Sequence, residues 1–304
     1  MIKIGIIGYN NGNGHPYSYS SIVNGFNKSY LKKYCKYPII KDYLLNKKSK
    51  QLVNFARVTH IWTGEKKISN QISKIANIPN ICNHYKDFLN KVDGVILARD
   101  DLKLNYEIIK FFVKKKIPLF VDKQITTDFQ KLLKIENMIK KNKTLFFAGS
   151  CIRFSKEIAS FKKKINKKNI NFVVGNSRSY WIRYAHHILE PLIIVLGTSI
   201  KYIKCEENNQ KQILKIKYKN GIICILIFDD NFFDIKLNFL LKNNNDKQII
   251  FKDYYSSFSE TLKKFILMVK NHKKMANFDD IFGIARIVLQ GQKAINNPGK
   301  KIYL

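Results

Sequence analysis

Short apolar runs alternate with helix-like segments throughout the first half of the chain. The first run is Ile2–Ile7, and runs of the same kind follow at Arg57–Thr63, Lys91–Ala98 and Ile117–Val121. Residues 17–26, 68–76, 104–114 and 129–140 have the apolar spacing of helices. Apolar strands that alternate with helices indicate a parallel sheet covered by helices on both faces. We therefore expect an α/β domain with a doubly wound parallel sheet over residues 1–123.

The second half has a different rhythm. Apolar runs near 213–218, 222–228, 234–241 and 248–251 are separated by turn residues, and Asn220-Gly221 is a strong hairpin signal. Helical patterns at 260–271 and 279–294 close the chain. These patterns predict an α+β domain with a mostly antiparallel sheet over residues 124–304. The segment 27–54, inserted after the first helix, shapes either a cleft or a subunit contact, and the sequence leaves both open.

Composition excludes some classes of protein. The 304 residues include 55 Lys+Arg and 22 Asp+Glu, a formal net charge of +33, but only six of the basic residues are arginine and the lysines are spread evenly. Because arginine is the preferred residue for recognising bases and phosphates, we expect no specific nucleic-acid partner. No apolar run reaches the ~18–20 residues of a membrane span. The five cysteines are scattered without a C-x-x-C pair, which favours a reducing cytoplasm and no structural zinc site.

A glycine-rich loop follows the first strand and precedes Pro16. Gly8, Gly12 and Gly14 allow a sharp turn, and backbone N–H groups at the start of the next helix could approach a pyrophosphate. The spacing is not G-x-G-x-x-G, so a plain strand-to-helix turn explains the loop almost equally well. Its position in the first β–α turn favours a dinucleotide site. Glu65, after the second strand, could bind a ribose hydroxyl, although the two lysines that follow it would equally favour a 2′-phosphate.

Charged residues also follow the next two strands. Arg99, Asp100 and Asp101 follow one strand, and Lys123 follows another within Asp122-Lys123-Gln124. Ligands of such sheets bind outside the carboxyl ends of the strands. The two aspartates could instead cap the next helix, and Lys123 could be one of many surface lysines.

Residues 180–191 hold the densest set of candidate catalytic side chains. His187 and Glu190 are three residues apart and share one face of a helix. A histidine can act as general base near neutral pH, and the carboxylate could orient its ring. A pair of buried structural histidines is the alternative. His186 and His187 point to different faces, which argues against a shared metal ion.

These motifs, in this order, resemble the glucose–fructose oxidoreductase, inositol dehydrogenase and MocA (Gfo/Idh/MocA) family over essentially the whole chain. Asp122-Lys123-Gln124 is similar to the family's strand-end Glu-Lys-Pro. The spacing of His187, Glu190 and Gly197 matches its helix motif, and Gly14-His15-Pro16 resembles a subgroup with an unusual first loop. Where the family commonly has an acid four residues before the histidine, this chain has Arg183, and Gln124 replaces the proline.

The resemblance implies an N-terminal Rossmann domain that binds NAD or NADP and a C-terminal domain that lines the substrate cleft and often forms an oligomer interface. It implies that Lys123 and His187 lie beside the nicotinamide and the substrate. The expected catalytic residues are Lys123, Tyr184, His187 and Glu190; the cofactor residues are Gly8, Gly12, Gly14, His15, Glu65, Arg99, Asp100 and Lys123; the substrate residues are Trp181, Arg183 and His186.

On this basis we expect a homo-oligomeric, cytoplasmic NAD(P)-dependent oxidoreductase. It would transfer hydride between the nicotinamide and a hydroxyl or carbonyl of a sugar, nucleotide-sugar or cyclitol. His187 would accept the hydroxyl proton while Lys123 holds the oxygen. The alternative is a catalytically inactive dinucleotide-binding sensor or partner protein with the same fold, which the departures at Arg183 and Gln124 support.

Overall fold

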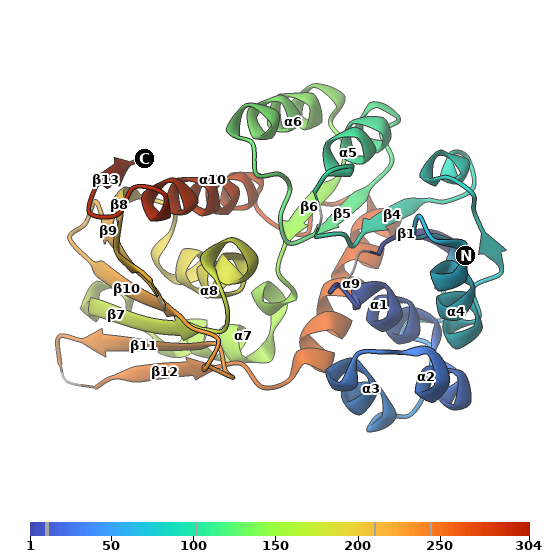
Figure 1. Ribbon diagram of the computed structural model, residues 1–304, viewed down its shortest axis with the longest axis horizontal. Helices are drawn as coiled ribbons and strands as arrows, with labels where there is room; N and C mark the ends of the chain where they lie inside the picture. Colours follow the sequence, from blue (N-terminus) through green and yellow to red (C-terminus); the bar gives the residue numbers. More distant parts are fainter. Residues whose placement is uncertain (10–11, 101, 210, 244) are drawn as a thin grey trace. The chain divides into compact units, whose positions relative to one another are not determined.

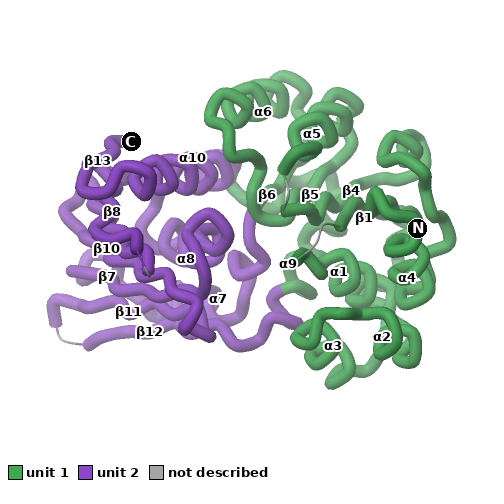
Figure 2. Tube along the Cα trace, in the orientation of Figure 1, with its two compact units in different colours: residues 1–148, 258–277 green, residues 149–257, 278–304 purple. Residues whose placement is uncertain are grey.

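The computed structural model describes residues 1–9, 12–100, 102–209, 211–243 and 245–304. The chain forms two compact units (Figure 2). Unit 1 contains residues 1–148 and 258–277, and unit 2 contains residues 149–257 and 278–304. Each unit has its own sheet, and the two sheets differ in strand direction.

Unit 1 is built on a six-stranded sheet with the order β3-β2-β1-β4-β5-β6. The pairings β1–β2, β1–β4, β2–β3 and β4–β5 are all parallel. The strand order reverses between β1 and β4, which is the switch point where doubly wound sheets bind dinucleotides. The strands are β1 (Ile2–Ile7), β2 (Ala56–Trp62), β3 (Asn80–Ile81), β4 (Gly94–Leu97), β5 (Leu119–Asp122) and β6 (Phe146–Gly149).

Helices cover both faces of this sheet, which explains its continuously apolar strands (Figure 1). All four residues of β4 are buried, and α4 buries Ile68, Ile72 and Ile75 at helical spacing. In Figure 1, α5 and α6 lie on one side of the sheet, and α1, α4 and α9 lie on the other. The helices are α1 (His15–Asn24), α2 (Lys28–Tyr34), α3 (Pro38–Leu45), α4 (Lys66–Ala76), α5 (Asn105–Lys114), α6 (Phe129–Asn142) and α9 (Tyr254–Asn271).

Unit 2 contains a seven-stranded sheet with the order β12-β11-β7-β10-β9-β8-β13. Among the pairings described in this second sheet, only that of β10 with β7 is parallel. Those of β8–β9, β9–β10, β7–β11, β11–β12 and β8–β13 are antiparallel. The elements are β7 (Ile170–Ser177), β8 (Ile200–Asn208), β9 (Gln212–Tyr218), β10 (Ile223–Phe228), β11 (Lys236–Leu241), β12 (Lys247–Ile250), β13 (Lys301–Tyr303), α7 (Lys156–Lys164), α8 (Trp181–Leu196) and α10 (Phe278–Ile295).

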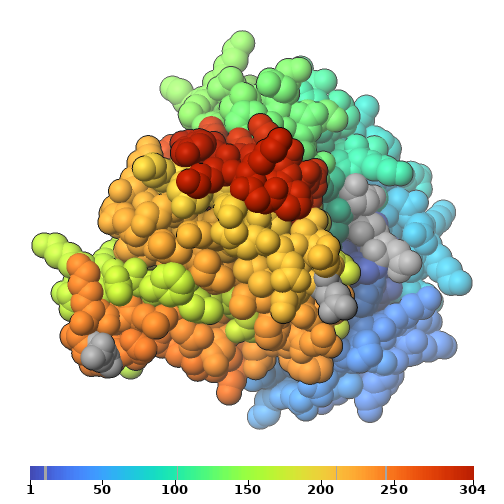
Figure 3. Space-filling model, turned by 60° about the vertical axis from the view of Figure 1, so that its left-hand side comes forward, coloured from blue at the N-terminus to red at the C-terminus, as the bar shows by residue number. Residues whose placement is uncertain are grey.

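One face of the second sheet packs on α8 and α10, and the other is turned toward the viewer in Figure 3. In that view β13, in dark red, lies next to the golden surface of β8 and β9. Along β10, buried residues alternate with half-buried Ile223, Ile225 and Ile227. The strand is therefore apolar on both faces, although helices cover only one of them.

The expected fold class is confirmed: a parallel α/β sheet is followed by a mostly antiparallel one. The change of architecture was expected at residue 123, whereas unit 1 continues to Ala148, because β6 joins the same sheet beside β5. The inserted segment 27–54 forms α2 and α3, which pack within unit 1 against α4 and α1. Among the described helices, none has a stretch both long and apolar enough to cross a bilayer.

Candidate functional site

The turn between β1 and α1 is packed tightly by the chain itself. A Cβ atom added to Gly8 would lie 2.1 Å from Cγ of Pro16 and 3.3 Å from the carbonyl oxygen of Ala98. A Cβ atom at Gly14 would come within 2.5–2.7 Å of side chains at the start of α3. Gly12 adopts a φ of +93°, in the left-handed region that favours glycine. These glycines bring the first helix close to the ends of β1 and β4.

The backbone donors at the start of α1 are used within the protein. The N–H of His15 donates to the Asn13 side chain over 2.9 Å, and the N–H of Tyr17 donates to the Gly14 carbonyl over 3.0 Å. Pro16, between them, has no N–H. Helix N-termini commonly bind phosphate through such donors. The first three residues of α1 therefore offer no unused N–H group to a ligand.

Asp122, the last residue of β5, holds the first residues of α1. Its side chain is 1% exposed. One carboxylate oxygen contacts Nδ1 of His15, and the other accepts a hydrogen bond of 2.9 Å from the hydroxyl of Tyr19. Burial by itself raises the pKa of this carboxyl, but the His15 ring and the Lys123 ammonium more than offset the effect, and the pKa lies well below its ordinary value. Asp122 is therefore a buried carboxylate that fixes the His15 ring.

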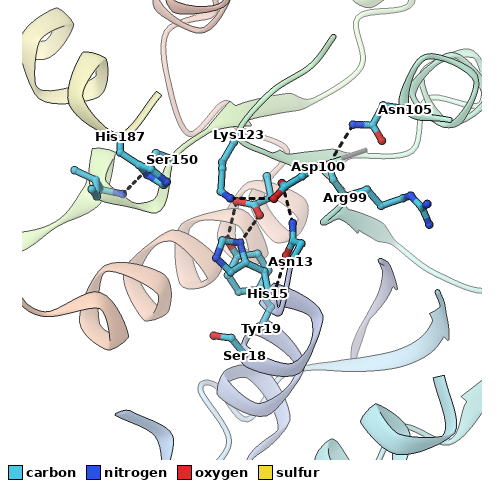
Figure 4. A network of polar contacts seen from close by, with 12 residues as sticks. Asn13, His15, Ser18, Tyr19, Arg99, Asp100, Asn105, Lys123, Ser150 and His187 are labelled. Atoms are coloured by element: carbon cyan, nitrogen blue, oxygen red, sulfur yellow. Dashed lines mark hydrogen bonds and ion pairs between the residues drawn. The ribbon is translucent and has the colours of Figure 1, made fainter. Parts of the chain in front are cut away.

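Lys123 extends this cluster to the ends of β4 and β1 (Figure 4). Its Nζ lies 3.5 Å from one carboxylate oxygen of Asp100, and the other oxygen accepts a hydrogen bond of 2.9 Å from the Asn13 amide. Lys123 has a φ of +68°, in the left-handed region. Its side chain therefore points in a different direction from that of a residue with the extended backbone of a strand. The structure thus brings together three residues expected from the sequence, His15, Asp100 and Lys123.

Two other expected cofactor residues lie near the end of β2. The Arg99 guanidinium is 5.9 Å from the ring centre of Trp62, and its Nη1 lies 3.5 Å from the Thr63 carbonyl oxygen. Glu65 is exposed at the N-cap of α4. Both are thus at the sheet edge where the second strand ends. Asp101, the third residue of the charged triplet, lies outside the described residues.

In unit 2, His187 is linked to Glu190 through Ser150 rather than directly. Nδ1 of His187 lies 2.5 Å from the hydroxyl oxygen of Ser150, and the Ser150 N–H donates to Oε1 of Glu190 over 3.1 Å. Ser150 is completely buried and follows β6 directly. The expected orientation of His187 by the Glu190 carboxylate is therefore indirect.

The other oxygen of Glu190 belongs to a buried ion-pair network. Arg153 donates to Oε2 of Glu190 over 2.6 Å and to Asp280 over 2.7 Å. Burial raises the pKa of the Glu190 carboxyl above its ordinary value, and the Arg153 guanidinium limits that rise. The network ties the segment after β6 to α8 and to the start of α10.

The remaining expected residues of α8 are dispersed around the helix. The Tyr184 ring lies 5.4 Å from the His187 ring, so these two residues are neighbours. Trp181 is completely buried, and its indole N–H donates to a backbone carbonyl of α10 over 2.8 Å. His186 is 4% exposed, whereas Arg183 is exposed. Trp181 and His186 thus lie inside unit 2, while Arg183 faces outward.

Sequence reasoning missed the positions of Asp122, Ser150, Arg153 and Asp280 in these networks. Asp122 and Ser150 share a signal that could have identified them, because each stands at or just after the carboxyl end of a strand, as Asp100 and Lys123 do. The pairing of Arg153 with Asp280 spans 127 residues, and no local pattern indicates it.

No family model and no curated protein matches this sequence. Solved structures do match its fold. The chain is similar to a myo-inositol 2-dehydrogenase from Lactobacillus plantarum, with a TM-score of 0.77 and 13% identity over 100% of this chain and 99% of the other. A scyllo-inositol dehydrogenase from Lactobacillus casei with bound NAD(H) and scyllo-inositol gives 0.74 and 12% over 97% and 96%. A myo-inositol dehydrogenase from Corynebacterium glutamicum gives 0.73 and 11% over 100% and 99%. The resemblance seen in the sequence is therefore confirmed at the level of the fold, which this chain shares with the inositol dehydrogenases.

Proposed function

We propose that this protein is an NAD(P)-dependent oxidoreductase that transfers hydride between the nicotinamide and a sugar, nucleotide-sugar or cyclitol. One observation carries the proposal: Asn13, His15, Asp100 and Lys123 converge at the carboxyl ends of β1, β4 and β5, in a sheet of order 3-2-1-4-5-6. That edge is the dinucleotide-binding place of such sheets. The shared fold with proteins whose structures contain NAD(H) supports the same conclusion.

In unit 1, we expect side chains to bind the dinucleotide, rather than the backbone N–H groups at the start of α1. His15 places a nitrogen heterocycle at the start of α1, where the first helical N–H groups already have partners within the chain. We assign His15 to the pyrophosphate, because it is the first residue of α1, at the helix end where phosphates commonly bind, and Asp122 fixes its ring there. Gly8, Gly12 and Gly14 shape the turn, and we assign Arg99 and Glu65, near the end of β2, to the adenosine ribose.

The cofactor, when bound, supplies the hydride chemistry. Lys123 is proposed to bind the reacting oxygen of the substrate through its ammonium group. His187, with Tyr184 beside it, is proposed to contact a hydroxyl or carbonyl oxygen of the substrate. Arg183, exposed on the first turn of α8, is a candidate for binding an anionic substituent of the substrate.

The proposal is tested in two steps. NADH and NADPH are titrated against the protein by fluorescence, and reduction of NAD⁺ and NADP⁺ is then followed over a panel of cyclitols, sugars and nucleotide sugars. Lys123→Met is expected to lower turnover at least a hundredfold with a small change in cofactor affinity. Lys115→Met, which removes an exposed lysine from the end of α5, is the matched control and should change neither. Turnover that survives Lys123→Met contradicts the assignment, and binding of the cofactor without turnover of any substrate supports the inactive sensor instead.

The homo-oligomer expected from the sequence is also part of the proposal. Ile223, Ile225 and Ile227 lie half-buried on the face of the second sheet that helices leave uncovered. A strand with two apolar faces is typical of a sheet buried on both sides. Ile225→Lys is expected to shift the protein to a smaller species in sedimentation, and an unchanged sedimentation coefficient would argue against this interface.

A further inference from the structure

Ser150 occupies a position in which each of its polar groups has a defined partner. It is the N-cap of the short 3-10 helix Cys151–Phe154, and its hydroxyl oxygen accepts a hydrogen bond of 3.2 Å from the N–H of Ile152. Its own N–H donates to Glu190, and the hydroxyl lies 2.5 Å from Nδ1 of His187. The residue is completely buried, so water does not reach the hydroxyl.

The hydroxyl proton needs an acceptor. A serine hydroxyl has one proton and two lone pairs, and the N–H of Ile152 already occupies one lone pair. Among the described residues that contact this hydroxyl, only Nδ1 of His187 can accept its proton. If Nδ1 carried a proton instead, the buried O–H would have no acceptor, which is unfavourable.

We infer that Ser150 donates to Nδ1 of His187, so that the neutral ring carries its proton on Nε2 and offers a hydrogen-bond donor there. The inference rests on the proposed function for its consequence in catalysis. His187 then binds an oxygen of the substrate as a hydrogen-bond donor. In carbonyl reduction the proton that completes the hydroxyl comes from the Lys123 ammonium, and in oxidation it returns to the Lys123 amine, rather than to His187 as expected from the sequence. Ser150 is a positioning residue, since it acts through His187.

The buried network keeps the hydroxyl at this place. Glu190 stands one helical turn after His187 on α8, and it holds the backbone of Ser150 through Oε1. Its Oε2 is fixed by Arg153, which also binds Asp280 at the start of α10. The distance between the Ser150 hydroxyl and α8 is thus set by three side chains from separate segments of unit 2.

The tautomer can be measured directly. Two-bond ¹⁵N–¹H spectra distinguish a protonated from an unprotonated ring nitrogen, and the protein has six histidines. His187→Gln identifies the signals by their loss. At about pH 8, where an ordinary histidine is neutral, we expect a protonated Nε2 and an unprotonated Nδ1 in the unmodified protein. A protonated Nδ1 of His187 in the unmodified protein at this pH would overturn the inference, whether or not the protein has oxidoreductase activity.

Two variants separate hydrogen bonding from loss of a helix cap. Ser150→Ala is expected to add a population with protonated Nδ1 and to lower kcat/KM about tenfold, the effect of one hydrogen bond. Ser155→Ala removes another buried N-cap serine, which accepts from the N–H of Ile158 over 3.2 Å and has no contact with His187. It should leave both the tautomer and kcat/KM unchanged, and an equal effect of the two variants would overturn the inference. If His187 carries its proton on Nε2 but the protein binds neither NADH nor NADPH, the inference about Ser150 stands and only the proposed function is refuted.

Discussion

His15 and His187 use the same ring nitrogen, Nδ1, but their partners have opposite hydrogen-bonding character. Nδ1 of His15 contacts the carboxylate of Asp122, which can only accept a hydrogen bond. Nδ1 of His187 contacts the hydroxyl of Ser150, whose proton has no other acceptor among the described residues. The two neutral rings therefore carry their protons on different atoms, Nδ1 in His15 and Nε2 in His187.

This relationship predicts two distinct signals in one spectrum. The same two-bond ¹⁵N–¹H measurement should show a neutral His15 protonated at Nδ1, opposite to His187. Asp122→Asn should weaken this preference, because a carboxamide can also donate to the ring. Identical tautomers for His15 and His187 would contradict the hydrogen-bond assignment of one of them.

Asp122→Asn should also destabilise the protein. The variant removes a buried charge from its contacts with His15 and Lys123, which is expected to lower the free energy of unfolding by about 3 kcal/mol at neutral pH. Because the folded pKa of Asp122 lies below its unfolded value, the carboxylate stabilises the protein above pH ~4 and loses this contribution as the pH falls further. Urea titrations of both proteins at several pH values should therefore converge under acidic conditions. Asp93→Asn, at an exposed carboxylate that accepts from the N–H of Lys3, is the control and should have a small effect at every pH.

His15→Gln should weaken cofactor binding if the proposed function is right. The expected change is a Kd for NADH about tenfold higher, or ~1.4 kcal/mol, because a charge-assisted contact with the pyrophosphate is lost. His272→Gln, at an exposed histidine of the same unit, should leave the fluorescence titration unchanged. An unaltered Kd in His15→Gln would remove His15 from the cofactor site.

Arg153→Met should be among the most destabilising single changes in unit 2. It leaves Glu190 buried without its cation, at an expected loss of about 3–5 kcal/mol at neutral pH. Burial raises the pKa of Glu190, and removing the guanidinium raises it further; protonation therefore restores part of the stability as the pH is lowered through the folded pKa. Thermal unfolding between neutral and mildly acidic pH would show the variant approaching the unmodified protein. Lys140→Met breaks a half-exposed pair with Glu136 and should cost no more than ~1 kcal/mol.

Local sequence patterns were sufficient for the fold class of both units. The apolar runs near β1, β2, β4 and β5 are strands because both their faces are buried, and the periodic segments between them are the helices that bury them. The turn Asn220-Gly221 joins β9 and β10 as expected, since glycine accommodates the positive φ of +95° found there. Patterns were less informative for β8, whose nine residues include five charged or amide side chains, and for the short helices α2 and α3.

The sequence by itself determined that polar residues after separate strands would gather at one edge, because the carboxyl ends of parallel strands meet there. His15, Asp100 and Lys123 could be assigned to one cluster on that ground alone. Tertiary structure decided which partner each histidine has: Asp122 lies 107 residues from His15, and Ser150 lies 37 residues from His187. Periodicity reports which face of an element is buried, but hydrogen bonds between distant segments depend on strand order and on the packing of helices against the sheet. For that reason the sequence identified both histidines, and only the folded chain showed which nitrogen of each can donate and which can accept.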